Sequence, residues 1–306
     1  DLTSLPVRFG VGAMSFGNFY GPTTEANSLA ILDAAMEHGV THIDTSNVYA
    51  MGGSENVIGT FLKARGTAAQ DHFHIATKAG ITKDADGNRC YRNDLEHLES
   101  ELDQSLDRMG LEAVDLLYIH RRQADMPIED ATGALARLVE KGKAKSIGFS
   151  EIAPSSLRRA AAVHPIAAVQ SEYSLSTRAP ELGLIQTCAE LGTALVAFSP
   201  VGRSLLTDSP VPADIIPSLP FLSTNPRFLE PNYSANIAIT DRFRALAAEM
   251  GEPAASLAIA WVLHKGQHTV PIPGTRSVAH FRELVRGTQI TLSDDDMARI
   301  ETALPV

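Results

Sequence analysis

Asp44, Tyr49, Lys78 and His120 are of the types that together can protonate a carbonyl oxygen. A tyrosine hydroxyl has a reference pKa of about 10, so alone it is a weak proton donor at neutral pH. An ammonium group beside it favours the phenolate and lowers the cost of releasing the proton. A carboxylate would keep that ammonium charged and in place, and an imidazole would hydrogen-bond and orient the carbonyl oxygen. The four residues are therefore candidates for the acid of a carbonyl reduction.

Each of these residues also has a structural interpretation when it is taken alone. An Asp at a strand end often caps a loop or a helix, and a Tyr commonly serves in packing. A Lys is usually solvated, and a His on an apolar strand is more often a hydrogen-bonded core residue. The catalytic interpretation is favoured because all four are expected at the carboxyl ends of strands, in an order that lets them converge.

Short apolar runs rich in β-branched residues alternate along the chain with amphipathic patterns of helical period. The runs are mostly continuous rather than alternating in polarity, as expected for parallel strands that are covered on both faces. We predict eight strands, at 9–14, 41–44, 73–78, 116–120, 146–150, 167–170, 194–198 and 269–272. Helices are predicted at 25–38, 94–109, 127–141, 154–163, 180–191, 240–250 and 253–264.

This alternation indicates βαβ units and hence an α/β fold. Eight units predict a (β/α)8 TIM barrel, an eight-stranded parallel barrel that forms a single domain over residues 1–306. A doubly wound open sheet has the same local pattern and is kept as an alternative. The stretch 203–239, after the seventh strand, is long and rich in Pro, Ser and Asn. Loops of this length are usually lids or binding loops; the alternative is a disordered surface insertion.

Composition excludes several classes of function. The net charge is −10, so nucleic-acid binding through a basic surface is not expected. Two cysteines, Cys90 and Cys188, are too few for a disulfide framework and have no metal-ligand spacing, so no metal is expected. No apolar stretch reaches the roughly 18 residues of a membrane span, and no secretory signal is visible. We therefore expect a cytoplasmic protein without a membrane partner, either a monomer or a homo-oligomer.

Several motifs, in order along nearly the whole chain, resemble those of the aldo-keto reductase family. The segment 42–49 followed by Gly52-Gly53-Ser54-Glu55 is similar to the family signature around its Asp and Tyr. The segments 76–78, 114–120, 142–150, 170–175 and 271–276 resemble further family motifs. The similarity is strongest to the plant and bacterial branch that includes perakine-reductase-like and auxin-induced-type proteins. It implies a (β/α)8 barrel that binds NADP(H) without a Rossmann domain, and no Gly-x-Gly-x-x-Gly motif is present.

The resemblance also implies roles for individual residues. Tyr49 would be the general acid, activated by Lys78 and Asp44, and His120 would orient the substrate. Ser150 and Gln170 would hold the nicotinamide carboxamide, and Phe198 would present an aromatic face. Arg276 would meet the adenosine 2′-phosphate, so NADP(H) is favoured over NAD(H). The other implied cofactor contacts are Ser199, Pro200, Gly202, Arg203, Gly274 and Thr275. Departures from the family pattern are Glu151, His280 and Leu284.

The substrate is expected to be a small carbonyl compound or alcohol. Barrel geometry places Phe19, Tyr20, Tyr91 and the long loop 203–239 at the mouth of the pocket, with ordinary packing as the alternative. A roomy aromatic pocket would suit a cyclic or aromatic compound. Two other functions are kept as alternatives: a cofactor-binding regulatory subunit with little turnover, as in potassium-channel β subunits, and a different barrel enzyme such as an isomerase.

Overall fold

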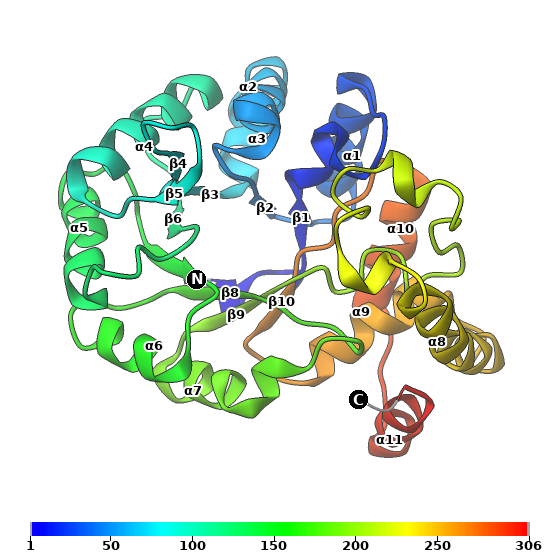
Figure 1. The fold of residues 1–306 in the computed structure, drawn as a ribbon. Coiled ribbons are helices and arrows are strands. Elements are labelled where there is room, and N and C mark those ends of the chain that lie inside the picture. The colour runs from blue at the N-terminus through cyan, green and yellow to red at the C-terminus, as the bar shows by residue number, and fades with distance from the viewer. Residues whose placement is uncertain (1, 305–306) are drawn as a thin grey trace.

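The computed structural model describes residues 2–304 and shows a barrel of eight parallel strands (Figure 1). The strands follow one another in the order β1, β2, β3, β6, β7, β8, β9 and β10. Their bounds are Gly10–Gly12 (β1), His42–Asp44 (β2), His74–Ala79 (β3), Leu116–Ile119 (β6), Ile147–Ser150 (β7), Ala168–Glu172 (β8), Ala194–Phe198 (β9) and Thr269–Pro271 (β10). Each overlaps one of the predicted strands, so the predicted order of eight parallel strands is confirmed.

The first and last strands meet, which nearly closes the sheet. The backbone N–H of Gly12 donates to the carbonyl oxygen of Pro273 at 3.0 Å, just beyond the end of β10. A Cβ atom on Gly12 would lie only 2.5 Å from the carbonyl oxygen of Ile272, so this approach requires a glycine. The structure is therefore a barrel, and the alternative of a doubly wound open sheet is wrong.

Two groups of apolar side chains hold the barrel together. Successive residues of a strand point to opposite faces, so each strand contributes to both groups. Inside the barrel, Leu116, Tyr118, Val196 and Val270 belong to a buried cluster. The neighbouring residues, among them Leu117, pack outward against the helices in a much larger cluster. This double burial explains why the strands appear in the sequence as continuous apolar runs.

The helices surround the barrel (Figure 1). Their bounds are Glu25–Glu37 (α1), Gly53–Arg65 (α2), Thr67–His72 (α3), Leu95–Met109 (α4), Ile128–Glu140 (α5), Pro154–Ala161 (α6), Leu184–Leu191 (α7), Asn232–Glu249 (α8), Ala254–His264 (α9), Val278–Arg286 (α10) and Asp294–Ala303 (α11). The Thr24 hydroxyl accepts from the Asn27 N–H, and the Asp94 carboxylate accepts from the His97 N–H. These caps fix the starts of α1 and α4 where the sequence predicts them. α2, α3, α10 and α11 have no counterpart among the predicted helices.

Two predicted helix boundaries are wrong. The helix predicted at 180–191 is divided into a 3-10 helix, Ala179–Leu182, and α7, because Gly183 adopts a φ of 119° between them. The helix predicted to begin at residue 240 already begins at Asn232, so the last part of the predicted loop 203–239 is helical.

The rest of the long loop after β9 is ordered by an apolar cluster of its own. The loop contains the 3-10 helices Ile216–Ser218 and Pro226–Phe228. The buried members of its cluster are Leu205, Ile216, Leu219, Leu222, Phe228 and Tyr233. In Figure 1 the loop lies on the side of α8 and α10. The structure therefore contradicts the alternative of a disordered insertion.

A hairpin that the sequence did not predict follows β3. It pairs β4 (Ile81–Lys83) with β5 (Arg89–Tyr91) in antiparallel register. Among the described residues, no single helix has the length and apolar composition of a membrane span; only α8 and α9, bent by 92° relative to each other, meet that test as a pair.

Candidate active site

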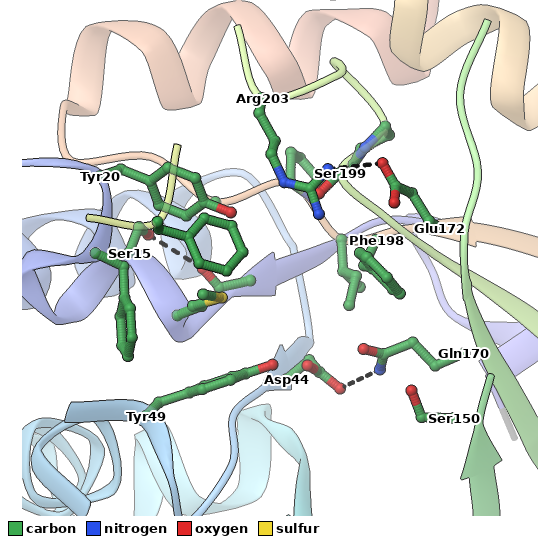
Figure 2. A pocket seen from close by; sticks show the side chains of 18 of the residues that line it. Ser15, Tyr20, Asp44, Tyr49, Ser150, Gln170, Glu172, Phe198, Ser199 and Arg203 are labelled. Atoms are coloured by element: carbon green, nitrogen blue, oxygen red, sulfur yellow. Dashed lines mark hydrogen bonds and ion pairs between the residues drawn. The ribbon is translucent and has the colours of Figure 1, made fainter. Parts of the chain in front are cut away.

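Asp44, Tyr49, Lys78 and His120 converge at the carboxyl end of the barrel. Asp44 is the last residue of β2, and Lys78 lies near the end of β3, which pairs with β2. His120 directly follows β6, the strand on the other side of β3. Tyr49 begins a short 3-10 helix, Tyr49–Gly52, in the loop after β2. Figure 2 shows the hydroxyl end of Tyr49 directed toward Asp44.

The Lys78 ammonium group is fully buried, and each of its three hydrogens has an acceptor. It forms an ion pair with Oδ1 of Asp44, and it donates to the carbonyl oxygen of Thr45 at 2.8 Å. Its third acceptor is the Tyr49 hydroxyl oxygen, at 3.2 Å. The other Asp44 oxygen accepts from Nε2 of Gln170 at 2.8 Å. These bonds fix the ammonium group beside the tyrosine hydroxyl, where the sequence places it.

Burial decides the proton affinity of Tyr49. It raises the pKa of Tyr49 above the ordinary value, and the opposing effect of the Lys78 ammonium offsets this only in part. The Lys78 ammonium therefore favours the phenolate, in the direction that the sequence analysis expects, but burial has the larger effect on the pKa of Tyr49. Burial alone would lower the pKa of Lys78, but Asp44 and Tyr49 outweigh it, so that pKa is raised. At neutral pH the site holds a protonated tyrosine beside a charged lysine.

His120 is neutral and is held by a hydroxyl group. Burial lowers its pKa well below the usual range, and the positive charges of Lys78 and Arg121 add to this effect. Its Nδ1 lies 3.0 Å from the buried Ser46 hydroxyl oxygen. That contact leaves Nε2 as the ring nitrogen for a ligand in the cavity that His120 lines.

Ser150 and Gln170 are register partners at the ends of β7 and β8. The Gln170 amide nitrogen is used by Asp44, so its amide oxygen remains for a ligand. The Ser150 hydroxyl oxygen accepts from Nη1 of Arg121 at 2.9 Å. Figure 2 shows Ser150, Gln170 and Phe198 close to Asp44 at one end of the pocket. A hydroxyl, an amide and an aromatic ring therefore lie together there.

One cavity of about 1930 Å³ contains most of the predicted site. It exceeds the roughly 300–1,000 Å³ of a typical small-molecule pocket, so it has room for a large cofactor and a substrate together. The predicted residues on its wall are Phe19, Tyr20, Asp44, Tyr49, His120, Ser150, Gln170, Phe198, Ser199, Pro200, Arg203, Gly274, Thr275 and Arg276. Within residues 2–304, no group of three or more His, Cys, Asp or Glu side chains is arranged to hold a metal ion.

Three predicted residues do not reach this wall. Lys78 lies behind Tyr49 and has no exposed side-chain surface. Gly202 shapes the turn after β9, where its φ is 59° and a Cβ atom would lie 2.9 Å from the Ser176 hydroxyl oxygen. Tyr91 is not brought into the pocket: it is 37% exposed on β5, because the hairpin turns its side chain outward over Arg89.

The Arg203 guanidinium forms an ion pair with the Glu172 carboxylate. Its Nη1 donates to Oε1 of Glu172 at 2.8 Å (Figure 2). Nη1 of Arg227 donates to the same oxygen at 2.5 Å. Arg227 lies in the 3-10 helix Pro226–Phe228, so Glu172 links the long loop to the end of β8. Arg203 is therefore a positioned and largely neutralised cation.

Comparison with known proteins agrees with this geometry over nearly the whole chain. The model of the Aldo/keto reductase family matches residues 8–305. Aldo-keto reductase yakc of Schizosaccharomyces pombe, whose name specifies NADP(+), is 35% identical over 96% of this chain and 87% of its own length. The probable aldo-keto reductase 1 of Glycine max is 35% identical over 98% of this chain and 86% of its own length. The chain belongs to the aldo/keto reductase family.

Solved structures of this family have the same barrel. A glycerol dehydrogenase from Gluconobacter oxydans has a TM-score of 0.84 at 25% identity, over 98% of this chain and 92% of that one. An aldo-keto reductase from Bacillus halodurans in its holo form has a TM-score of 0.79 at 23% identity, over 97% and 92% of the two chains. The second similarity supports the fold alone.

This aldo-keto reductase also places polar residues at the site that the sequence interpretation missed. Ser46 contacts His120, and Arg121 contacts Ser150. Glu172 anchors Arg203. Their positions in the sequence could have identified all three as site residues, because each lies close to a strand end. Ser46 and Glu172 lie two residues beyond Asp44 and Gln170, and Arg121 directly follows His120. Polar residues so close to strand ends are expected to share the same rim.

Proposed function

We propose that this aldo-keto reductase interconverts an aldehyde or ketone and the corresponding alcohol with NADP(H), and that Tyr49 gives the proton during reduction. The observation that carries the proposal is the Tyr49 hydroxyl. It lies 3.2 Å from the buried Lys78 ammonium and on the wall of a cavity that it shares with His120. The similarity to a reductase whose name specifies NADP(+) supports the choice of cofactor. The pair Ser150-Glu151 favours the perakine-reductase-like branch of the family.

The residues along the cavity fit a nicotinamide dinucleotide. Ser150 and Gln170 offer a hydroxyl and an amide beside Asp44, which suits a carboxamide. The exposed Arg276 guanidinium donates to the carbonyl oxygen of Pro22 at 2.9 Å, so its charge remains available to a phosphate. Further proposed contacts are Phe198, Ser199, Pro200, Arg203, Gly274 and Thr275, with Gly202 shaping their turn. When bound, the cofactor supplies the hydride.

The protein's own part in the reaction is to orient the carbonyl and deliver a proton. Tyr49 accepts a hydrogen bond from Lys78, so its own proton is free to point into the cavity. As Tyr49 gives up that proton, the adjacent ammonium stabilises the phenolate that forms. Neutral His120 would donate from Nε2 to the carbonyl oxygen, provided that Nδ1 carries no proton. Lys78 acts through Tyr49, because it does not reach the cavity wall.

The function is tested by mixing the purified protein with NADPH and a panel of aldehydes and ketones, including glyceraldehyde and dihydroxyacetone, and following NADPH absorbance. We expect NADPH oxidation with part of the panel, and NADP+ reduction with the matching alcohols. Tight NADPH binding without turnover in either direction would favour a regulatory subunit. The absence of both binding and turnover would contradict the proposal.

Ser46→Ala is expected to lower kcat about tenfold with little change in the KM for NADPH. The Ser46 hydroxyl oxygen lies 3.0 Å from Nδ1 of His120, closer than the other acceptors within its reach, the carbonyl oxygen of Lys78 and Oδ1 of Asn47, which both lie at 3.4 Å. We propose that Ser46 donates to Nδ1 and so places the ring proton on Nε2, which is the nitrogen needed to donate to the carbonyl. Loss of one such hydrogen bond corresponds to about 0.5–1.5 kcal/mol.

The tautomer is read directly by NMR of protein labelled with 15N-histidine. The wild type should show His120 protonated at Nε2, and Ser46→Ala should show a mixture of tautomers. A wild-type ring protonated at Nδ1 would contradict this role for Ser46, whatever the activity of the variant.

Arg276→Gln is expected to raise the KM for NADPH about tenfold and to leave the KM for NADH unchanged. A hydrogen bond from a charged group contributes about 1.5–3 kcal/mol, and NADH lacks the phosphate that would receive it. Steady-state kinetics with both cofactors measures the difference. Arg282→Gln is the matched control, because Arg282 lies on α10, is exposed, and is not on the cavity wall. Equal losses with NADPH and NADH would exclude a 2′-phosphate contact.

A further inference from the structure

Three cationic side chains lie on the wall of the cavity that His120 also lines. Arg121 follows His120 directly, and Lys83 and Arg89 are cross-strand partners on the hairpin β4–β5. All three line the same cavity as Tyr49. The charges of Arg121 and Arg89 also reach the imidazole, where they help to keep it neutral. A carbonyl group at His120 would therefore lie in a positive field.

The cavity wall also carries the carboxylates of Glu101, Glu151 and Glu172, and each of them accepts a hydrogen bond. Glu101 accepts from the Asn47 amide, and Glu151 accepts from the backbone N–H of Glu172 at 2.8 Å. Glu172 in turn accepts from Arg203 at 2.8 Å. Within residues 2–304, none of these carboxylates forms an ion pair with Lys83, Arg89 or Arg121; Glu172 pairs instead with Arg203 and Arg227.

The two guanidinium groups contact only neutral groups. Arg121 donates from Nη1 to the carbonyl oxygen of His120 at 2.6 Å and to the Ser150 hydroxyl at 2.9 Å. Arg89 is exposed and packs over the Tyr91 ring at 5.6 Å. Within residues 2–304, neither guanidinium has a carboxylate at ion-pair distance, whereas most other arginines do, Arg108 with Glu55 among them. Both guanidinium groups are therefore available to bind an anion in the cavity.

We propose that the substrates of this site are carbonyl compounds that carry a carboxylate, which Arg89 and Arg121 bind while the carbonyl oxygen lies at Tyr49 and His120. This inference rests on the proposed reductase function. A guanidinium binds a carboxylate through two parallel hydrogen bonds, and the attraction is strengthened where the walls of a cleft exclude water. The aromatic side chains of Phe19 and Tyr20 cover another part of the same wall. An aromatic or cyclic oxo acid satisfies both features.

The test compares two aldehydes of nearly the same shape, 4-carboxybenzaldehyde and its neutral analogue 4-formylbenzamide, with NADPH as the reductant. We expect the carboxylate to have a KM at least tenfold lower, and this advantage to shrink at high salt because ions screen an exposed charge pair. Arg89→Gln should raise the KM for the carboxylate about ten times more than it raises the KM for the amide, so that the preference for the carboxylate is lost.

Arg242→Gln is the matched control, because it removes the same charge from an exposed position on α8 that is not on the cavity wall. Arg242→Gln should leave the KM and the kcat unchanged for both aldehydes. Equal KM values for the two aldehydes in the wild type, or an equal effect of Arg89→Gln on both, would overturn the inference and leave the reductase function intact.

If neither aldehyde is reduced although NADPH binds, calorimetry on the NADPH complex decides the inference separately. Tighter binding of the carboxylate that Arg89→Gln weakens about tenfold would support it even though the proposed function fails. Equal binding of the two compounds would overturn it.

Discussion

Tyr49→Phe is expected to reduce kcat for carbonyl reduction by a factor of about 10²–10⁴, the usual contribution of a positioned general acid. The substitution removes only the hydroxyl that accepts from Lys78 at 3.2 Å and keeps the ring on the cavity wall. NADPH binding, followed by fluorescence titration, should be unchanged because Tyr49 lies outside the proposed cofactor contacts. Single-turnover measurements are needed as well, because product release limits kcat in many enzymes.

Tyr20→Phe is the control, because Tyr20 presents a second tyrosine hydroxyl to the same cavity (Figure 2). Burial raises the pKa of Tyr20, and the Arg203 charge beside it opposes this shift, so its environment partly resembles that of Tyr49. It has no buried lysine beside it, and we expect less than a threefold change in kcat. Retention of activity in Tyr49→Phe together with its loss in Tyr20→Phe would mean that Tyr20, and not Tyr49, donates the proton.

The strand ends were the most predictable part of the site. Asp44, Lys78, Ser150 and Gln170 each stand where an apolar run gives way to polar residues. In parallel strands of similar register such ends must share one rim, and the pairing of Ser150 with Gln170 confirms this. The family motifs occur in the family's order along the chain, which supported the order of the predicted strands and helices. They also identified Tyr49, which lies in the loop after β2.

Features that depend on three-dimensional packing were not predictable in this way. The raised pKa of Tyr49 follows from burial, which residue types alone do not reveal. Tyr91 was expected at the pocket because it follows the third strand, but the hairpin β4–β5 turns it outward. That hairpin is short and mostly exposed, so it has no apolar alternation to reveal it. α2 was not predicted because its start has no capping side chain: it begins at Gly53, directly after Gly52, which has a left-handed backbone conformation.

Lys78→Met is expected to lower kcat by a factor of about 10²–10³ and the free energy of unfolding by about 3–5 kcal/mol, as expected when one member of a buried ion pair is removed. The stability loss arises because Asp44, which is 2% exposed, would be left without the ammonium that compensates its charge. The loss of activity arises because the phenolate of Tyr49 would no longer be stabilised. Thermal or chemical denaturation and steady-state kinetics measure the two effects.

The double variant Asp44→Asn/Lys78→Met separates these two causes. It removes both charges, so much of the stability should return, because the neutral amide that replaces the Asp44 carboxylate would need no counterion and Gln170 remains beside it. Activity should stay low, because the proton donor still lacks the ammonium. Recovery of both stability and activity in the double variant would mean that Lys78 serves the fold alone.

The pH dependence of alcohol oxidation gives the sharper test of Lys78. In that direction Tyr49 must accept a proton, so the rate rises with pH as the hydroxyl ionises. Burial raises the pKa of Tyr49 and the Lys78 ammonium opposes that rise, so removing the ammonium must raise this pKa further. The rise in rate with pH should therefore occur at higher pH in Lys78→Met than in the wild type. A lysine that only supports packing would lower the rate without changing the pH at which it rises. A rate that rises at the same pH in the variant and in the wild type would contradict an electrostatic coupling between Lys78 and the proton on Tyr49.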